Sequence, residues 1–307
     1  MGSKNKLAPN ILNIIASRHK DISDFYDLFG GGGAISFYAS DNYRFKVHYN
    51  ELNKHIYELV KYIVENKTLS PKFYEWVSRE MFFEQIDKSD ADWYSGFVMS
   101  CWSFGNNSEK GYLYGQDIEE SKRLAHELVV NGDLMAMNAL GIDIPTIVNI
   151  PNIQDRRTAF CRFVKGSNCR FDLQHLERLQ HLERLEHLER LQHLEHLQHL
   201  EHLDITNISY ENVHIRGENP ILYCDIPYKG KAEYKEGGFN HERFYDWANN
   251  SDYPVYISEY SAPFEIVDSV KYRSTLSKDS NTTKSIESLF WNGKGKIFNT
   301  KLFKSIL

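Results

Sequence analysis

The sequence predicts an α/β fold in which a long, mostly helical insertion interrupts a parallel sheet. Short apolar segments alternate with segments of helical pattern towards both ends of the chain, which is typical of a parallel sheet. The middle of the chain, from about residue 71 to residue 205, has a mostly helical pattern instead. The length of 307 residues suits two domains, or one large domain that carries an insertion.

Two strands and a helix are predicted before the insertion. Residues 24–29 form the first strand, the glycines at 30–33 a turn before a helix-compatible stretch, and residues 45–50 the second strand. Residues 53–64 form an amphipathic helix because apolar side chains recur on one of its faces; these are Ile56, Leu59, Val60, Ile63 and Val64.

Two further strands are predicted after the insertion. Residues 221–226 and 255–259 have the apolar pattern of buried strands. We therefore expect residues 1–70 and 206–307 to form one sheet domain, and residues 71–205 to form the inserted region.

A leucine repeat lies within the expected insertion. From Leu173 to Leu203 every third residue is leucine, eleven in all, and seven of the 13 histidines of the chain lie in this run. The run contains no glycine or proline, so it favours helix. Three residues turn an α-helix by about 300°, so the leucine stripe circles the helix rather than forming a coiled-coil seam. We expect a helix wrapped or bent against the protein, and its histidines are too widely spread to predict a metal site.

The composition excludes several classes of protein. The chain is 41% hydrophobic and 14% aromatic, which supplies a sizeable core and excludes a mainly disordered protein. No stretch approaches about 18 consecutive apolar residues and the N-terminus lacks a signal-peptide pattern, so we expect a cytoplasmic protein without membrane contact. The four cysteines form no CxxC pair and are too sparse for a zinc cluster or a disulfide scaffold.

The four glycines, Gly30 to Gly33, lie where a strand ends and a helix begins. Glycine at this place lets a ligand approach the backbone and leaves helix N-terminal N–H groups free. Glu51 follows about 20 residues later, at the end of the second predicted strand, where a carboxylate can bind both hydroxyl groups of a ribose. Because the run is not a GxGxxG sequence, a nucleoside with a short tail is as suitable a ligand as a dinucleotide.

A second turn, whose side chains could take part in binding or catalysis, follows the apolar run Ile221 to Cys224. Asp225, Ile226, Pro227 and Tyr228 place a carboxylate, a proline-fixed bend and an aromatic ring at the end of a predicted strand. This is the arrangement expected at the ligand crevice of an open α/β sheet.

The Asp-Ile-Pro-Tyr turn resembles the Asp-Pro-Pro-Tyr motif of amino-methyltransferases that use S-adenosylmethionine, with Ile226 in place of the first proline. The order of glycine turn, long insertion and this motif resembles the alpha group of DNA adenine methyltransferases, the Dam-like class. Further segments are similar to other parts of that family, in the same order: residues 1–6, 104–107, 112–115, 239–245 and 257–260.

The resemblance implies a Rossmann-like methyltransferase sheet with an inserted, mostly helical target-recognition domain. Residues 1–70 and 206–307 are then the two halves of the catalytic domain, and residues 71–205 recognise the target. The implied cofactor is S-adenosyl-L-methionine, with nine expected contact residues: Lys4, Asp27, Phe29, Gly30, Gly31, Gly32, Gly33, Glu51 and Asp225.

The implied reaction is methylation of the exocyclic amine (N6) of an adenine that is flipped out of duplex DNA. Asp225 and the backbone carbonyl of Ile226 are expected to accept the two N–H bonds of the amine, while Pro227 fixes the turn and Tyr228 stacks on the base. Because a backbone carbonyl is the second acceptor, isoleucine at position 226 need not abolish activity.

Double-stranded DNA is the implied partner, although the formal net charge of the chain is −6. Residues 71–155 hold 14 acidic and 6 basic side chains, which accounts for more than the whole excess. We expect this region to face away from DNA, and the DNA contacts to come from basic residues before the repeat: Arg157, Arg162, Lys165 and Arg170.

Alternatives remain open from the sequence. Methylation of the exocyclic amine (N4) of cytosine is chemically similar, and a non-catalytic, methyltransferase-like DNA-binding protein is a further alternative. We expect a monomer or weak dimer that is encoded by a bacterium or a phage. The sequence leaves open whether a cognate restriction endonuclease accompanies the protein.

Overall fold

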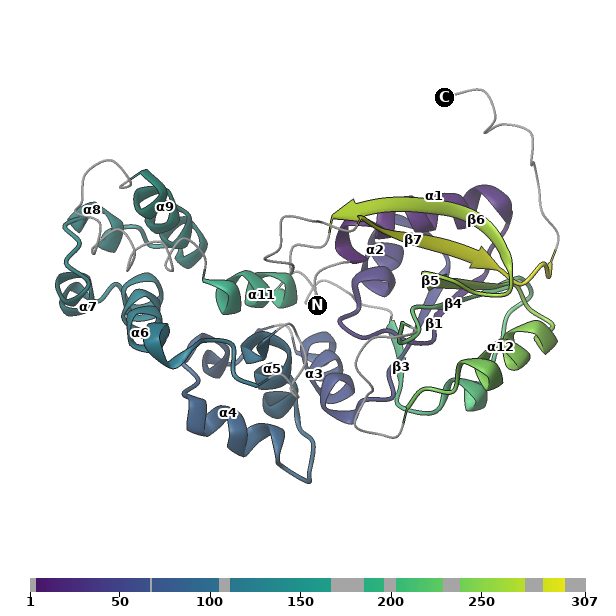
Figure 1. Cartoon of the computed structure of the whole chain (residues 1–307), viewed down its shortest axis with the longest axis horizontal. Coiled ribbons are helices and arrows are strands. Elements are labelled where there is room, and N and C mark those ends of the chain that lie inside the picture. Colours follow the sequence, from purple (N-terminus) through teal and green to yellow (C-terminus); the bar gives the residue numbers. More distant parts are fainter. Residues whose placement is uncertain are drawn as a thin grey trace. The chain divides into compact units, whose positions relative to one another are not determined.

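The computed structural model describes residues 4–66, 68–104, 111–166, 185–195, 203–228, 238–273 and 284–295. The chain forms two compact units (Figure 1). The first unit combines Met1–Lys61 with Leu200–Leu307, and the second is the continuous segment Tyr62–His199. That the second unit recognises a DNA target stays a prediction.

The first unit is built on a seven-stranded sheet in the order β3-β2-β1-β4-β5-β7-β6. The strands are β1 (Asp24–Asp27), β2 (Lys46–Asn50), β3 (Leu203–Thr206), β4 (Pro220–Cys224), β5 (Val255–Glu259), β6 (Glu265–Arg273) and β7 (Lys284–Trp291). The first five in the sheet order are parallel, whereas β7 is antiparallel to both of its neighbours. This mixed α/β sheet is consistent with a methyltransferase fold.

Two expectations about the sheet need correction. The sheet is not wholly parallel, because only ten residues separate β6 from β7, and a parallel crossover needs about a dozen or more. The expected end of the insertion at residue 205 falls inside β3, whose pairing with β2 places Leu203–Thr206 in the sheet. The predicted strands at 24–29, 45–50, 221–226 and 255–259 are confirmed as β1, β2, β4 and β5.

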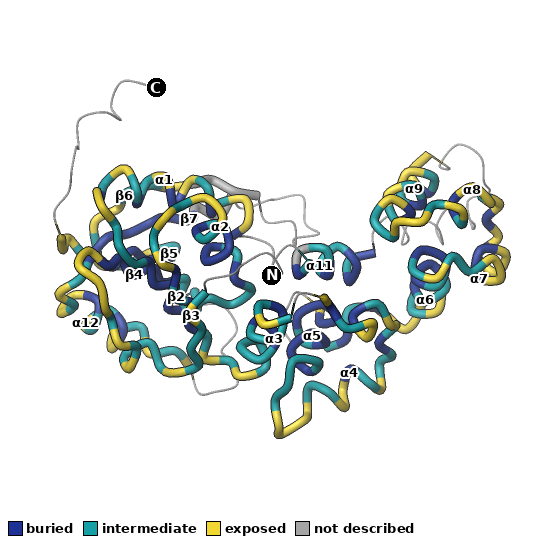
Figure 2. The backbone as a smooth tube through the Cα atoms, turned by 180° about the vertical axis from the view of Figure 1, so that it is seen from behind, coloured by how far each residue is buried: buried dark blue, intermediate teal, exposed yellow. Residues whose placement is uncertain are grey.

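Helices cover both faces of this sheet (Figure 1). The helices α1 (Ala8–Arg18) and α2 (Ala34–Asn42) pack against one face, and α12 (His241–Asn250) packs against the other. Neighbouring strand residues alternate between the two cores: Phe25 and Ile221 face α1 and α2, whereas Tyr26 and Leu222 face α12. Figure 2 shows β4 and β5 as buried segments, which agrees with the full burial of both strands.

The second unit is helical over the residues described, as the sequence predicts. It contains α4 (Arg79–Ile86), α5 (Trp93–Trp102), α6 (Gln116–Asn131), α7 (Leu134–Ala139), α8 (Pro145–Val148), α9 (Ile153–Gly166) and α11 (Glu186–Glu195). The helix α3 (Lys54–Glu65), predicted at 53–64, spans the boundary between the units. An aromatic cluster of Trp76, Trp102, Tyr112 and Tyr114 surrounds His126 and His187.

The described part of the leucine repeat confirms the prediction of helix. Its four leucines at 185, 188, 191 and 194 are each no more than 1% exposed. Since successive leucines are about 60° apart around the axis, together they cover about half of the helix surface. Glu186–Glu195 is therefore a helix with a wide buried face. The remaining repeats, except Leu203 in β3, lie outside the described residues.

Candidate active site

The two predicted turns leave the sheet at one edge. Strands β1 and β4 are parallel neighbours with Asp27 opposite Tyr223, and the backbone N–H of Leu28 donates to the carbonyl of Tyr223 at 2.9 Å. The strand order reverses here, because β2 and β3 continue on one side and β5 on the other. Such a switch point is where open α/β sheets bind their ligands. The fold thus brings the glycine turn and the Asp225 turn together.

The glycine turn is held to the end of β2. The N–H of Gly31 donates to Oε2 of Glu51 at 2.7 Å, and the hydroxyl of Tyr49 donates to the carbonyl of Gly31 at 2.6 Å. A Cβ atom on Gly30 would lie 2.1 Å from the Tyr49 ring, and one on Gly33 would lie 1.7 Å from the Phe37 ring. A Cβ on Gly31 would have nothing within 4 Å. Packing therefore requires glycine at positions 30 and 33, whereas a side chain at position 31 would enter open space.

Asp27 is a buried carboxylate at the end of β1. The side chain is almost fully buried, and Oδ2 accepts a hydrogen bond from the Ser36 hydroxyl at 2.8 Å. No partner for Oδ1 lies among the described residues. Burial raises the pKa of Asp27 to about 7, the hydrogen bond from Ser36 opposes this, and Asp225 and Glu51 add to it. The site therefore contains a carboxylate oxygen suited to a donor or a cation.

Asp225 lies in a network that sequence reasoning foresaw only in part. Oδ1 of Asp225 is 3.2 Å from Nζ of Lys4, which also donates to the Tyr228 hydroxyl at 2.6 Å and pairs with Glu287 of β7. The Tyr228 hydroxyl in turn donates to Oε1 of Glu287 at 2.9 Å. Glu287 was missed because the antiparallel strand β7 that carries it was not predicted.

The charged groups in this network shift one another's pKa values. Burial raises the pKa of Asp225, Lys4 opposes the rise, and Glu287 adds to it. Burial alone would lower the pKa of Lys4, but the carboxylates of Asp225 and Glu287 outweigh burial and raise it. Lys4 is therefore a charged ammonium that two carboxylates share.

The Asp225 turn is braced from behind. Nε2 of His241 lies 2.7 Å from the carbonyl of Pro227 and 3.8 Å from a carboxylate oxygen of Glu259, which is fully buried at the end of β5. The Ile226 side chain is 2% exposed and belongs to the core that faces α12. Isoleucine at this position thus contributes its side chain to the core. Neither His241 nor Glu259 was singled out by the sequence analysis.

Other predicted residues lie around the same edge. Phe29 is half-buried, with its ring 5.3 Å from that of Tyr210 and 5.6 Å from that of Phe239. Leu52, which directly follows Glu51, is 56% exposed although it is apolar. Leu52 was not singled out from the sequence.

The predicted DNA contacts belong to the second unit. Nη2 of Arg157 donates to the Gln192 side chain at 2.9 Å and Nη1 is 3.9 Å from Glu189, so Arg157 is engaged with α11. Arg162 and Lys165 are exposed. Arg170 lies outside the described residues.

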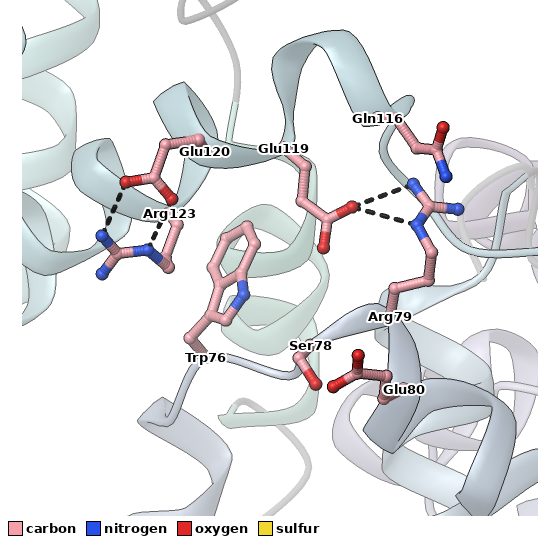
Figure 3. Close-up of a pocket in the computed structure, with 8 residues that line it drawn as sticks. All are labelled: Trp76, Ser78, Arg79, Glu80, Gln116, Glu119, Glu120 and Arg123. Atoms are coloured by element: carbon pink, nitrogen blue, oxygen red, sulfur yellow. Dashed lines mark hydrogen bonds and ion pairs between the residues drawn. The ribbon is translucent and has the colours of Figure 1, made fainter.

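A hollow of about 470 Å³ lies elsewhere, on the second unit (Figure 3). Its cations are already paired: Arg79 donates to Glu119 at 3.0 Å, and Arg123 binds both oxygens of Glu120. The other lining residues are Trp76, Ser78, Glu80 and Gln116. It contains none of the predicted site residues, so the sheet edge remains the candidate active site.

The described residues include neither a cluster of metal-ligating side chains nor a membrane-spanning helix. No group of three or more histidine, cysteine, aspartate or glutamate side chains there could hold a metal ion. No helix in the same part of the chain is long and apolar enough to cross a membrane.

The comparison with known families agrees with the motifs at the N-terminal part of this edge. Residues 1–136 match the model of the D12 class N6 adenine-specific DNA methyltransferases, a range that includes Lys4, the glycine turn and Glu51. No curated protein matches the chain. The family match confirms the resemblance to adenine-specific DNA methyltransferases and the enzyme class that it implies. Over residues 1–136, the chain is thus similar to the D12 class N6 adenine-specific DNA methyltransferases.

Proposed function

We propose that the protein is a Dam-like DNA methyltransferase that transfers the methyl group of S-adenosylmethionine to N6 of an adenine flipped out of duplex DNA. The observation that carries the proposal is the meeting of the glycine turn and the Asp225 turn at the switch point of the sheet. The family match of residues 1–136 supports the choice of adenine.

The residues at this edge fit S-adenosylmethionine. The cofactor carries a positively charged sulfonium and, at neutral pH, an ammonium group. Asp27 presents a buried carboxylate oxygen without a described partner, and its pKa responds to the nearby carboxylates of Glu51 and Asp225. Three converging carboxylates, of which only Asp225 pairs with Lys4, favour a cationic ligand.

Each part of the cofactor has candidate partners. Asp27 and Gly31 would hold the methionine part, and Glu51 would bind the ribose while its Oε2 keeps the glycine turn in place. Leu52 would pack against the adenine ring and lose its exposed apolar surface. When bound, the cofactor supplies an electrophilic methyl group.

The protein's own residues would prepare the adenine amine. Its lone pair is delocalised into the ring, so it is a weak nucleophile. Asp225 and the carbonyl of Ile226 would accept its two N–H bonds and direct the lone pair towards the methyl group for an in-line transfer. The raised pKa of Asp225 makes its carboxylate a stronger acceptor than an ordinary one. Tyr228 would stack on the flipped base.

Transfer of a labelled methyl group from S-adenosylmethionine to duplex DNA tests the proposal. We expect the label as N6-methyladenine, and Asp225→Ala should lose transfer while calorimetry still detects cofactor binding. The matched control is Asp246→Ala, which removes an exposed aspartate of α12 and should keep normal turnover. Label on cytosine, label on RNA only, or normal turnover of Asp225→Ala would contradict the proposal.

A further inference from the structure

Glu287 connects three segments that are far apart in the sequence. Its Oε1 atom pairs with Lys4 near the N-terminus and accepts from the Tyr228 hydroxyl at 2.9 Å. Lys4 also donates to that hydroxyl, at 2.6 Å, which closes a triangle of hydrogen bonds. Glu287 is 6% and Lys4 7% exposed, so the ion pair of this triangle is buried, whereas Tyr228 is half-buried.

The triangle determines how much of the Lys4 charge reaches Asp225. The ammonium lies 3.2 Å from Asp225 and also pairs with Glu287, so two carboxylates share one cation. A buried cation needs a partner. If Glu287 lost its charge, Lys4 would pair with Asp225 alone and weaken that carboxylate as an acceptor for the substrate amine.

The same triangle orients the aromatic ring of the turn. The Tyr228 hydroxyl contacts both Lys4 and Glu287, while its ring lies 4.7 Å from the ring of Tyr260 at 51°. Contacts at both ends restrict where the ring can lie. A base that stacks on Tyr228 would therefore meet a surface that is already positioned.

We propose that Glu287 is a positioning residue for methyl transfer, which holds Lys4 away from exclusive pairing with Asp225 and fixes the Tyr228 ring. The inference rests on the proposed function. It assigns a role in the reaction to β7, which lies outside the region that matches the family model.

The test compares Glu287→Gln with the wild type in steady-state methyl transfer. Glutamine keeps an acceptor oxygen for Tyr228 but removes the charge. We expect kcat to fall by about 10- to 100-fold, because small errors of position cost about this much. The KM for DNA, the Kd for S-adenosylmethionine and the melting temperature should stay close to wild-type values, and Glu287→Asp should recover part of the loss. The matched control is Glu265→Gln on β6, whose side chain is 58% exposed and pairs with Arg18; it should keep wild-type kcat.

A double-mutant cycle with Lys4→Met shows whether Glu287 acts through the lysine. The loss in the double variant should be smaller than the product of the two single losses, because each single change leaves a buried charge with fewer partners. Multiplying losses, unchanged kcat in Glu287→Gln, or a parallel loss of cofactor binding and melting temperature would overturn the inference. If Glu287→Gln does not fold, Glu287→Asp and Tyr228→Phe replace it in the test. Normal kcat in both of these variants would also overturn the inference. A wild-type protein without DNA methylation would refute the proposed function itself, whereas an active wild type with an unaffected variant refutes only the inference.

Discussion

Asp27 shows the conflict between stability and ligand binding at a single residue. Burial raises the pKa of its carboxyl group to about 7 in the folded protein, compared with an ordinary value of 3.8. The folded state therefore binds this proton more tightly than the unfolded state does. Between about pH 4 and pH 7 the contribution of Asp27 to the free energy of unfolding falls as pH rises, and above pH 7 it has been lost. At about 1.4 kcal/mol per pKa unit, the difference amounts to several kcal/mol.

Asp27→Asn should accordingly stabilise the protein much more at pH 8 than at pH 5. Asparagine stays neutral, so the cost of burying an ionised group disappears. Urea unfolding at the two pH values measures this difference. As a control, S-adenosylmethionine should raise the melting temperature of the wild type at pH 8 more than that of the variant, because the cation would pair with ionised Asp27. Equal stability of the two proteins at pH 8 would show that ionisation of Asp27 does not destabilise the folded state.

The glycines of the turn can be separated by substitution. Gly33 has a φ of 76° and its Cβ would overlap the Phe37 ring, whereas Gly31 has a φ of 48° and open space around it. Gly31→Ala should cost about 1–2 kcal/mol of unfolding free energy for the left-handed backbone alone. Gly33→Ala should cost clearly more, because ring and backbone must also move. Urea unfolding of both variants checks the order, and an equal cost would mean that Phe37 moves freely.

Residues at the ends of predicted strands could be foreseen, but their distant partners could not. Asp27, Glu51 and Asp225 follow from local patterns, since each ends or follows an apolar run. Glu287 is part of the same network only because β7 pairs with β5, and its own strand has little local signal. Long-range pairing of this kind is set by the packing of the whole sheet.

At the level of elements, α11 shows what the leucine repeat contributes. His187 is 2.6 Å from the Tyr114 hydroxyl, and Arg190 donates to the backbone carbonyls of Ser100, Cys101 and Ser103. These side chains recur every six residues along the repeat. Residues 179–184 read Leu-Gln-His-Leu-Glu-Arg, which differs from residues 185–190 only by glutamine in place of Glu186.

Deleting residues 185–190 should therefore leave the second unit folded. Residues 179–184 would then supply the same leucines, histidine and arginine, and the main loss would be the ion pair between Glu186 and Lys122, which are 3.2 Å apart. Urea unfolding followed by circular dichroism should show a small change.

Replacing Arg178 and Arg184 by glutamine should change the stability of the full chain little, because Arg190 is in place. The same replacement should destabilise the deleted chain by about 1–3 kcal/mol or more, since buried carbonyls lose their donor. A deletion that unfolds the unit by itself would contradict this interchange of repeats.

As with the residues, some strands could be predicted from local sequence and others could not. The strand predicted at 255–259 has those bounds in β5, and β1, β2 and β4 differ from their predictions by two residues or fewer at each end. Their apolar runs are buried on both faces of the sheet, so the local pattern is strong. The strand β6 lies at the sheet edge and β7 lies between it and β5. Both strands carry many polar side chains, so only their pairing with the sheet reveals them.

At the scale of the whole molecule, the fold brings together candidate site residues that are far apart in the sequence. The family match ends at residue 136, yet β4, which leads to Asp225, pairs directly with β1, which ends at Asp27. The order of motifs could be predicted from the sequence. That Lys4, Asp225 and Glu287 meet at one edge depends on the parallel pairing of β4 and the antiparallel entry of β7.

The charge of the whole molecule decides how it should bind DNA. Because the net charge of the chain is −6, only a local basic surface can attract the phosphates of DNA. Each phosphate contact releases counterions, so the number of contacts sets the salt dependence of binding. Arg162 and Lys165 are exposed on α9, whereas Lys88 lies in the acidic region and pairs with Asp92. We expect Arg162→Ala to weaken duplex binding and to reduce the slope of log Kd against log salt by about 0.9, the value for one phosphate contact. Lys88→Ala is the matched control and should leave the slope unchanged. If Lys88→Ala reduced the slope and Arg162→Ala did not, the acidic region would be the one that faces DNA, and the expected binding surface would be wrong.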